Sequence, residues 1–201
     1  MSGSKAAKTL EGKRLDEIVK EFIRGISVPP KQVSDKRVEG SSPYVRVSDL
    51  NDGIITGFKL KYVHPGFLRT NEAILRNGDV LLSITGTVGK VALVTREFEE
   101  AIAGPNLIVL RVDETVANPD YLCSALATEV VQDQFASLAT GSAIRYARVS
   151  DLKNVIVPIP PVDEQERRLK IINTLREDLR KKRVELHEIS RQIGKIVAGE
   201  K

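Results

Sequence analysis

The chain has little of what several large classes of protein require. One cysteine among 201 residues excludes an intrachain disulfide framework. The first 18 residues contain no apolar core of a secretion signal, so we expect a reducing, cytoplasmic location. The longest apolar runs, such as "NLIVL" at 106–110, are far shorter than the roughly 18 residues that a membrane-spanning helix needs. With only two histidines, His64 and His187, we expect no zinc cluster or catalytic triad with Cys123.

What is present indicates one globular core with an appendage. The composition, 41% hydrophobic and 29% charged, is ordinary, and a chain of this length can bury one core. The net charge is +4, and residues 162–201 hold 11 Lys and Arg against 8 Asp and Glu, which is most of the excess. A modest positive sum permits nucleic-acid binding without demonstrating it, and a solvated basic helix face is the simpler explanation of the charge alone.

The pattern of apolar and turn-forming residues changes along the chain and predicts an α+β fold. "RLDEIVKEFIRG" at 14–25 has an apolar stripe at helical spacing and ends in glycine, which predicts a short amphipathic helix. From Val28 to Val112, short β-branched runs alternate with Asn, Asp, Pro and Gly turns, which predicts a β-rich body. Residues 118–141 then predict one helix with Asn118 as its N-cap. Its sheet-facing residues would be Leu122, Leu126, Val130 and Leu138.

Prolines separate this body from a long helix. "VIVPIPP" at 155–161 predicts a short edge strand, so we place one domain at 1–161 and a long helix at 162–201. The helix carries apolar residues, and one lysine, at alternating spacings of three and four: Ile172, Leu175, Leu179, Lys182, Leu186, Ile189, Ile193 and Ile196. A stripe this narrow predicts a coiled coil, because a helix packed in a globular core carries a wider apolar face.

The stretch "LLSITGTVGKVAL" at 81–93 raises the question of a nucleotide-binding loop. A Walker loop needs its two glycines five positions apart and a hydroxyl residue after the lysine. Here Gly86 and Gly89 are three apart, and Val91 follows Lys90. Apolar strands flank the loop on both sides, so no helix N-terminus would face a phosphate. We therefore interpret the stretch as a turn joining two strands, which makes a nucleotide-binding enzyme the weakest of our hypotheses.

The tetrapeptide "NPDY" at 118–121 is a near miss to the Asn-Pro-Pro-Tyr signature of adenine methyltransferases. No glycine-rich cofactor loop follows an N-terminal strand, and a helix cap explains all four residues. The carboxylates are scattered, without the spacing of a nuclease site. We find no pattern of an enzyme active site.

One heptapeptide occurs nearly twice. "YVRVSDL" at 44–50 and "YARVSDL" at 146–152 share six of seven residues, and the similarity does not extend into the flanks. Each suits a short strand followed by a Ser or Asp cap. The repetition indicates two similar local structures or, as a sharper hypothesis, two copies on one surface.

Basic and polar side chains recur at the predicted turns. Arg, Lys, Thr and Tyr on loops of a rigid sheet are the residue types that contact DNA phosphates and base edges, although any protein surface carries them as well. The candidates for DNA contact are Arg46, Lys59, Lys61, Arg69, Thr87, Lys90, Arg145, Tyr146 and Arg148.

Taken together and in this order, the motifs resemble the specificity subunit of type I restriction and modification enzymes. The resemblance spans nearly the whole chain. Most specific is the linkage of a Gly-Ser-Ala-Ile segment, a proline-rich strand and "PPVDEQ" opening a long helix. The motifs that carry it are "RLDEIVKEFIRG", "YVRVSDLNDGII", "NGDVLLSITGTVGKVALV", "NPDYLCSAL", "GSAIRYARVSDLKNVIVPIPPVDEQERR" and the heptad helix.

The resemblance implies a non-catalytic chain. Residues 1–161 would be a target recognition domain that reads one half of a two-part sequence in double-stranded DNA, and the helix would space the halves and dock methyltransferase subunits. Catalysis would belong to partners: an adenine methyltransferase using S-adenosylmethionine and, in some systems, a restriction subunit with an ATP-driven, magnesium-dependent motor. The chain itself would bind no cofactor or metal. Family members commonly carry two recognition domains and two helices, whereas this sequence has one of each.

Two copies of the helix could supply the missing half. If two helices run antiparallel about a two-fold axis near residue 184, Ile172 meets Ile196 and Lys182 meets Leu186. A parallel pair would instead press Lys182 against its own copy. We therefore expect a homodimer and a palindromic, interrupted target. The alternative hypothesis from a different class is a coiled-coil adaptor that binds a protein through residues 162–197 and ignores DNA.

Overall fold

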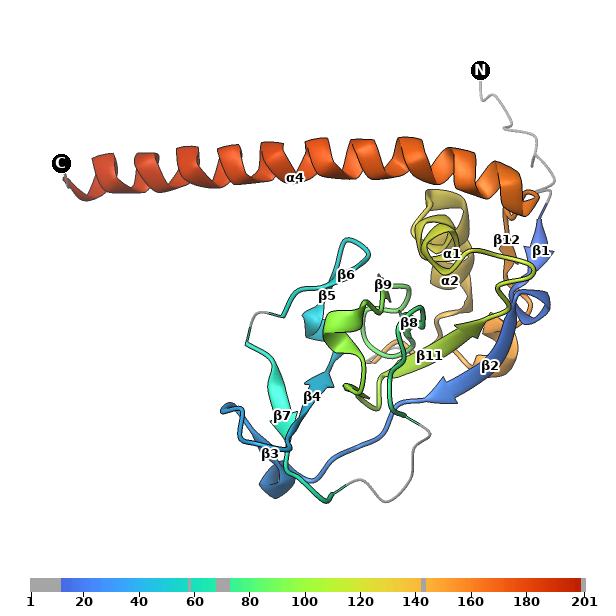
Figure 1. Cartoon of the computed structure of the whole chain (residues 1–201), viewed down its shortest axis with the longest axis horizontal. Coiled ribbons are helices and arrows are strands. Elements are labelled where there is room, and N and C mark those ends of the chain that lie inside the picture. The colour runs from blue at the N-terminus through green and yellow to red at the C-terminus, as the bar shows by residue number, and fades with distance from the viewer. Residues whose placement is uncertain (1–11, 58, 68–72, 142–143, 200–201) are drawn as a thin grey trace. The chain divides into compact units, whose positions relative to one another are not determined.

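The computed structural model describes residues 12–57, 59–67, 73–141 and 144–199. The chain divides into two compact units, Met1–Val162 and Asp163–Lys201, which we call the β-rich unit and the helical unit. Strands, short helices and one long C-terminal helix confirm the predicted α+β class (Figure 1). Within the described residues, no helix is both long and apolar enough to cross a membrane.

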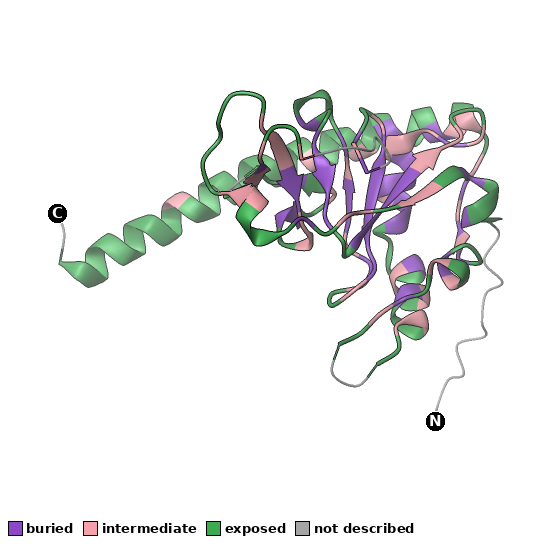
Figure 2. Ribbon diagram, turned by 90° about the horizontal axis from the view of Figure 1, so that it is seen from below, coloured by how far each residue is buried: buried purple, intermediate pink, exposed green. Residues whose placement is uncertain are grey.

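One four-stranded antiparallel sheet forms the centre of the β-rich unit, in the order β2-β11-β8-β9. Its strands are β2 (Val19–Arg24), β11 (Leu107–Val112), β8 (Val80–Ser83) and β9 (Val91–Leu93). Ile108 of β11 pairs with Arg24 on one side and with Leu82 on the other. All four residues of β8 are buried, and purple strands fill the middle of this unit in Figure 2.

A second four-stranded sheet has the order β10-β4-β7-β3, with β10 parallel to β4. Its strands are β10 (Ile102–Ala103), β4 (Ser42–Val45), β7 (Lys61–Val63) and β3 (Val33–Ser34). Two short pairs complete the strands: β5 (Leu50–Asn51) with β6 (Ile54–Ile55), and β1 (Lys13–Arg14) with β12 (Ile156–Val157). The strand predicted at "VIVPIPP" is therefore confirmed as β12.

The helix predicted at 14–25 is wrong. This stretch forms a 3-10 turn, η1 (Leu15–Glu17), and then strand β2. β2 pairs with β11 along its length, with a register shift between Arg111 and Val112. The edge of β11 would otherwise leave a row of backbone groups without partners, and filling it outweighs the local helical spacing.

The helix predicted at 118–141 is two helices. These are α1 (Pro119–Leu126) and α2 (Glu129–Leu138), with Thr128 as the N-cap of the second. The Asn118 side chain caps α1 by accepting from the amides of Asp120 and Tyr121, as the sequence predicted. α1 packs on β8 and β9.

The break between α1 and α2 changes which residues face inward. Leu122 and Leu126 are buried, as expected, but Val131 and Phe135 are buried in α2 while Val130 is 41% exposed. Leu138 is half-buried. The expected inward position of Val130 is therefore wrong, because the interruption rotates the second helix relative to a continuous one.

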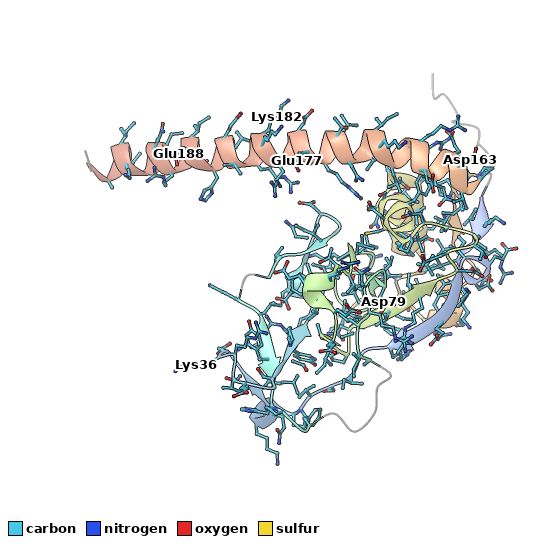
Figure 3. The ribbon with its side chains drawn as sticks, in the orientation of Figure 1. Lys36, Asp79, Asp163, Glu177, Lys182 and Glu188 are labelled. Carbon is cyan, nitrogen blue, oxygen red and sulfur yellow. The ribbon has the colours of Figure 1, made fainter. Side chains whose placement is uncertain are left out.

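The remaining short elements connect the sheets. They are η2 (Pro30–Gln32), η3 (Val47–Asp49), η4 (Arg96–Phe98) and α3 (Val149–Leu152). The helical unit is formed by α4 (Val162–Ala198), 37 residues or about 55 Å at 1.5 Å per residue. Lys182 and Glu188 are labelled along it in Figure 3.

Candidate nucleic-acid interface

The turn between β8 and β9 is the hairpin that the sequence predicted. Val80 pairs with Leu93 and Leu82 with Val91, so strands lie on both sides of the turn. Inside it, the Gly89 amide donates to the Ser83 carbonyl at 3.0 Å and the Lys90 amide donates to the Ser83 hydroxyl at 2.9 Å. Gly89 has φ +96°, and an added Cβ would lie 2.7 Å from the Gln132 amide oxygen, so only glycine fits.

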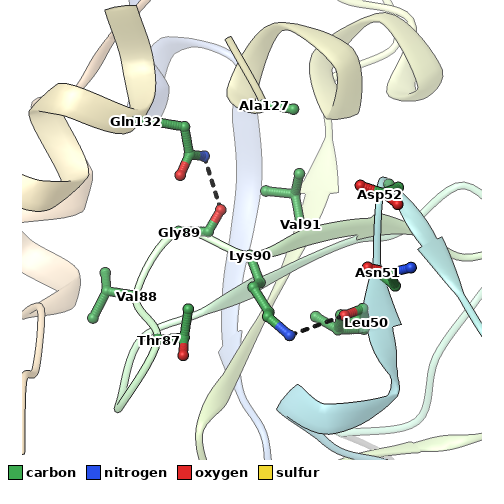
Figure 4. A pocket seen from close by; sticks show the side chains of 11 residues that line it. Leu50, Asn51, Asp52, Thr87, Val88, Gly89, Lys90, Val91, Ala127 and Gln132 are labelled. Atoms are coloured by element: carbon green, nitrogen blue, oxygen red, sulfur yellow. Dashed lines mark hydrogen bonds between the residues drawn. The ribbon is translucent and has the colours of Figure 1, made fainter. Parts of the chain in front are cut away.

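A cavity of about 320 Å³ lies beside this turn (Figure 4). The Lys90 ammonium donates to the Leu50 carbonyl at 3.3 Å, and the Gln132 amide donates to the Gly89 carbonyl at 2.8 Å. These bonds hold the turn between the β5-β6 hairpin and α2. The cavity is lined by Leu50, Asn51, Asp52, Gly53, Thr87, Val88, Gly89, Lys90, Val91, Ala127 and Gln132.

A second segment runs along the other side of the turn. The Gly86 amide donates to the Arg145 carbonyl at 2.8 Å, and the Ala147 amide donates to the Ile84 carbonyl at 3.0 Å. Tyr146 exchanges two backbone hydrogen bonds with Thr140, at 2.8 and 3.0 Å. The fold thus gathers four of the predicted residues around one turn: Thr87, Lys90, Arg145 and Tyr146.

A residue that sequence reasoning missed joins this group. Arg24, at the end of β2, donates from Nη2 to the Tyr146 hydroxyl at 2.6 Å, and its guanidinium carbon lies 6.0 Å from the ring centroid. The two residues are 122 positions apart, and the local spacing at 14–25 favours a helix, so no local signal pairs them. We call Arg24 and Tyr146 the Arg-Tyr pair.

Three other predicted residues lie together but are engaged within the protein. Arg46 forms an ion pair with the buried Asp49 at 3.0 Å, and it also donates to the Lys59 carbonyl at 3.3 Å. Lys61 forms an ion pair with Asp35, and this pairing lowers the pKa of the Asp35 carboxyl. Arg46 therefore stabilises the fold locally, whatever else it contacts.

Two predicted residues remain. Arg148 is exposed at the N-cap of α3. Arg69 lies outside the described residues.

Elsewhere in the β-rich unit, a buried carboxylate lies beside an arginine. Burial raises the pKa of Asp79, which accepts from the Arg76 amide at 2.8 Å and lies 3.6 Å from Arg111 Nε. Arg111 also pairs with Glu21 at 3.0 Å. These contacts tie β11 to β2 and to the turn before β8. Among the described residues, no group of three or more His, Cys, Asp or Glu could hold a metal ion.

Comparison with known families gives a match over most of the chain. The family model described as "Type I restriction modification DNA specificity domain" matches residues 8–188.

Curated relatives agree with this match at low identity. The EcoBI specificity subunit of a type I restriction enzyme from Escherichia coli is 27% identical over 124 residues, covering 60% of this chain and 26% of that protein. The MjaVIII specificity subunit from Methanocaldococcus jannaschii is 25% identical over 174 residues, covering 86% of this chain and 37% of that protein. The chain thus spans between about a quarter and two fifths of these relatives.

Solved structures show the same fold. The HsdS subunit from Thermoanaerobacter tengcongensis has a TM-score of 0.64 at 22% identity, covering 84% of this chain and 42% of that one. A type I restriction-modification S subunit from M. genitalium has a TM-score of 0.59 at 20% identity, covering 84% and 39%. At such identities the likeness concerns the fold alone.

Proposed function

Because the chain belongs to the family of type I restriction-modification DNA specificity domains, we propose that it selects the DNA sequence on which an adenine methyltransferase acts. The observation that carries this proposal is the family match over residues 8–188, together with the cluster of hydrogen-bond donors around the β8-β9 turn. In this proposal the chain contributes recognition and positioning. The chemistry belongs to partners, which would hold S-adenosylmethionine and, where a restriction subunit takes part, ATP and magnesium.

The donor cluster suits the two kinds of contact that sequence recognition requires. Lys90 and Arg148 are cations suited to phosphate oxygens, and such contacts supply affinity that weakens as salt rises. The turn hydroxyl of Thr87 and the Arg-Tyr pair are directional donors suited to base edges. Arg24 ends strand β2, Thr87 and Lys90 lie on the β8-β9 turn, and Tyr146 bridges Thr85 beside that turn, which favours a fixed geometry.

We further propose that two copies associate through α4. The seam residues Leu175, Leu186 and Ile196 are 62%, 62% and 76% exposed. Leu179, Ile189 and Ile193 are also exposed, while Ile172 is half-buried. An apolar stripe of this length in water favours association.

The seam favours the antiparallel arrangement. Two antiparallel helices centred near residue 184 match every seam position with another, and Lys182 then lies against Leu186, its stem covering apolar surface while its ammonium reaches water. Each recognition domain is joined to the start of α4, so the two domains would be attached at opposite ends of a rod of about 55 Å. Such a dimer would read a palindromic target interrupted by a spacer.

Adenine mapping tests the recognition proposal. The chain is co-expressed with a type I adenine methyltransferase subunit from the same genome, and methylated adenines are mapped across the host DNA. We expect one bipartite motif that disappears when this chain is left out. The absence of any chain-dependent motif would refute the proposal and favour a coiled-coil adaptor.

Sedimentation tests the dimer. We expect a dimer at micromolar concentration that Leu186→Glu converts to a monomer, because the charge would enter the seam. Val184→Glu is the matched control, since Val184 is 67% exposed on the same helix but off the seam. A monomeric wild-type chain would contradict the proposal.

Cross-linking tests the direction of the helices. Ile172→Cys should form no disulfide with its own copy in the antiparallel dimer, whereas the double variant with Ile196→Cys should cross-link. A cross-linked single variant would instead indicate parallel helices.

A further inference from the structure

The Arg-Tyr pair is held from both of its ends. Arg24 is the last residue of β2 and pairs with Ile108 in the central sheet. Tyr146 is fixed by backbone pairing to Thr140 on one side and by a bridge to Thr85 on the other. The Arg24 backbone is therefore set by the central sheet and the Tyr146 backbone by these two bridges, which fixes the relative position of the two side chains.

The direction of their hydrogen bond is unambiguous. A guanidinium carries donors only, so Arg24 donates and the Tyr146 hydroxyl oxygen accepts. The phenol proton is then left to donate elsewhere. Within the part of the chain that the structure describes, neither this proton nor the other N–H groups of Arg24 have a protein acceptor. The pair thus presents several directed donors and no strong acceptor to an incoming ligand.

Among DNA groups, such an array matches acceptor-rich base edges. Guanine offers two adjacent acceptors, N7 and O6, in the major groove, and an arginine that contacts both is the commonest specific protein contact to a base. Adenine pairs an acceptor with a donor on the same edge, which an array of donors alone fits less well. A donor array of this kind therefore selects guanine over adenine.

We propose, resting on the function proposed above, that the Arg-Tyr pair is the element that reads a G·C base pair in the recognised half-site. Arg24 contacts the guanine edge, and Tyr146 both orients Arg24 and donates to a neighbouring acceptor. Ile144, two residues before Tyr146 in the chain, is an exposed apolar side chain on the same segment.

The geometry favours a base contact over a phosphate contact. Phosphate oxygens are bound by flexible lysines as well as by arginines, so affinity for a phosphate does not depend on a second residue that fixes the guanidinium plane. Here Arg24 uses one of its N–H donors in the hydrogen bond to Tyr146, and this bond restrains the guanidinium plane. Restraint of that kind supports recognition of a planar edge.

The test is selection from a randomised duplex DNA library by the wild-type chain and by the variants Arg24→Ala and Tyr146→Phe. We expect the wild type to enrich a motif containing an invariant G·C pair. Arg24→Ala should reduce the preference for G·C over other base pairs at that position by about 5- to 100-fold. The base preferences at the other positions should stay unchanged. Tyr146→Phe should reduce the same preference by about 3- to 10-fold. The ring remains, but the hydroxyl no longer accepts from Arg24 or donates to the DNA.

Controls separate the possible outcomes. Arg96→Ala removes an exposed arginine elsewhere and should leave the selected motif intact. Thermal melting of each variant shows that it is folded. Arg24→Ala could instead weaken DNA affinity equally for all sequences, lower the salt slope of that affinity by about one and leave the motif unchanged. That result would overturn the inference in favour of a phosphate contact. Failure of the wild type to select any motif would instead refute the proposed function itself.

Discussion

The two copies of the repeated heptapeptide adopt similar backbones but expose different side chains. In each, an extended arginine caps a helical turn, η3 or α3, and the aspartate amide donates to the arginine carbonyl at 2.9 or 3.0 Å. In the first copy, Tyr44 is buried and donates to the Ile26 carbonyl at 2.9 Å. In the second, Tyr146 lies at the surface with Arg24.

The arginines differ in the same way. Arg46 donates from Nε and Nη2 to the carboxylate of Asp49, which is 2% exposed. Arg148 is exposed, and within the described residues no partner of its side chain is found. The flanks explain the difference, because Thr56 closes the β5-β6 hairpin onto the Asp49 carbonyl at 2.8 Å. The same sequence therefore stabilises the fold in one place and leaves its arginine exposed in the other.

The largest expected effect comes from the two aspartates. Asp49→Ala should lower the free energy of unfolding by about 3 kcal/mol, because it removes the acceptor of three hydrogen bonds from Arg46. Asp151→Ala, the matched change in the second copy, should cost less than about 1 kcal/mol. Urea denaturation of both variants measures the difference. Equal losses would contradict the distinction between the copies.

Substitutions of the two tyrosines should differ less in their cost to stability than those of the two aspartates. Tyr44→Phe leaves the Ile26 carbonyl without its donor and should cost about 1 kcal/mol. Tyr146→Phe should change stability by less than about 0.5 kcal/mol, since the hydrogen bond that its hydroxyl accepts from Arg24 is exposed. Thermal melts at one pH compare the two. A larger loss for Tyr146→Phe would show that the Arg-Tyr pair is mainly structural.

The two arginines should separate binding from stability. Arg148→Ala should lower the salt slope of DNA affinity by about one, as expected for one lost phosphate contact, and leave the melting temperature nearly unchanged. Arg46→Ala should lower the melting temperature because it leaves the Asp49 carboxylate without its ion pair. Fluorescence anisotropy at several salt concentrations gives the slope. An unchanged slope for Arg148→Ala would remove that residue from the interface.

The smallest effect is a pH dependence of the first copy. Burial raises the pKa of Tyr44 above its ordinary value of about 10, so the folded state holds this proton when the unfolded state has lost it. Stability should therefore fall as the pH rises above about 10, and this contribution should be below about 1 kcal/mol at pH 10.5. Tyr44→Phe should show a shallower decline than the wild type between pH 9 and 10.5. Parallel declines would show that Tyr44 titrates as it does in the unfolded chain.

Features governed by local spacing could be read from the sequence. The heptad pattern and the prolines before it predicted a long helix at 162–201, and α4 spans Val162–Ala198. The glycines of "SITGTVGK" predicted the hairpin, and "NP" at 118–119 predicted the cap of α1. In the helix and the cap, the hydrogen-bond partners lie within one helical turn of each other. In the hairpin, a single short turn separates the paired strands, so periodicity and turn chemistry are sufficient.

Tertiary structure decided what depends on distant partners. The stretch at 19–24 has apolar residues at spacings that suit a helix, yet it becomes β2 because β11 offers it a ladder of hydrogen bonds. Only that pairing brings Arg24 to Tyr146, and only the β5-β6 hairpin buries Asp49 while its counterpart Asp151 stays near the surface. The sequence by itself determined the long helix α4, the β8-β9 turn and the cap of α1. Arg46 and Arg148 occupy the same position in two nearly identical heptapeptides. Long-range packing decided that the first is paired and the second exposed, since burial depends on which other segments cover a residue.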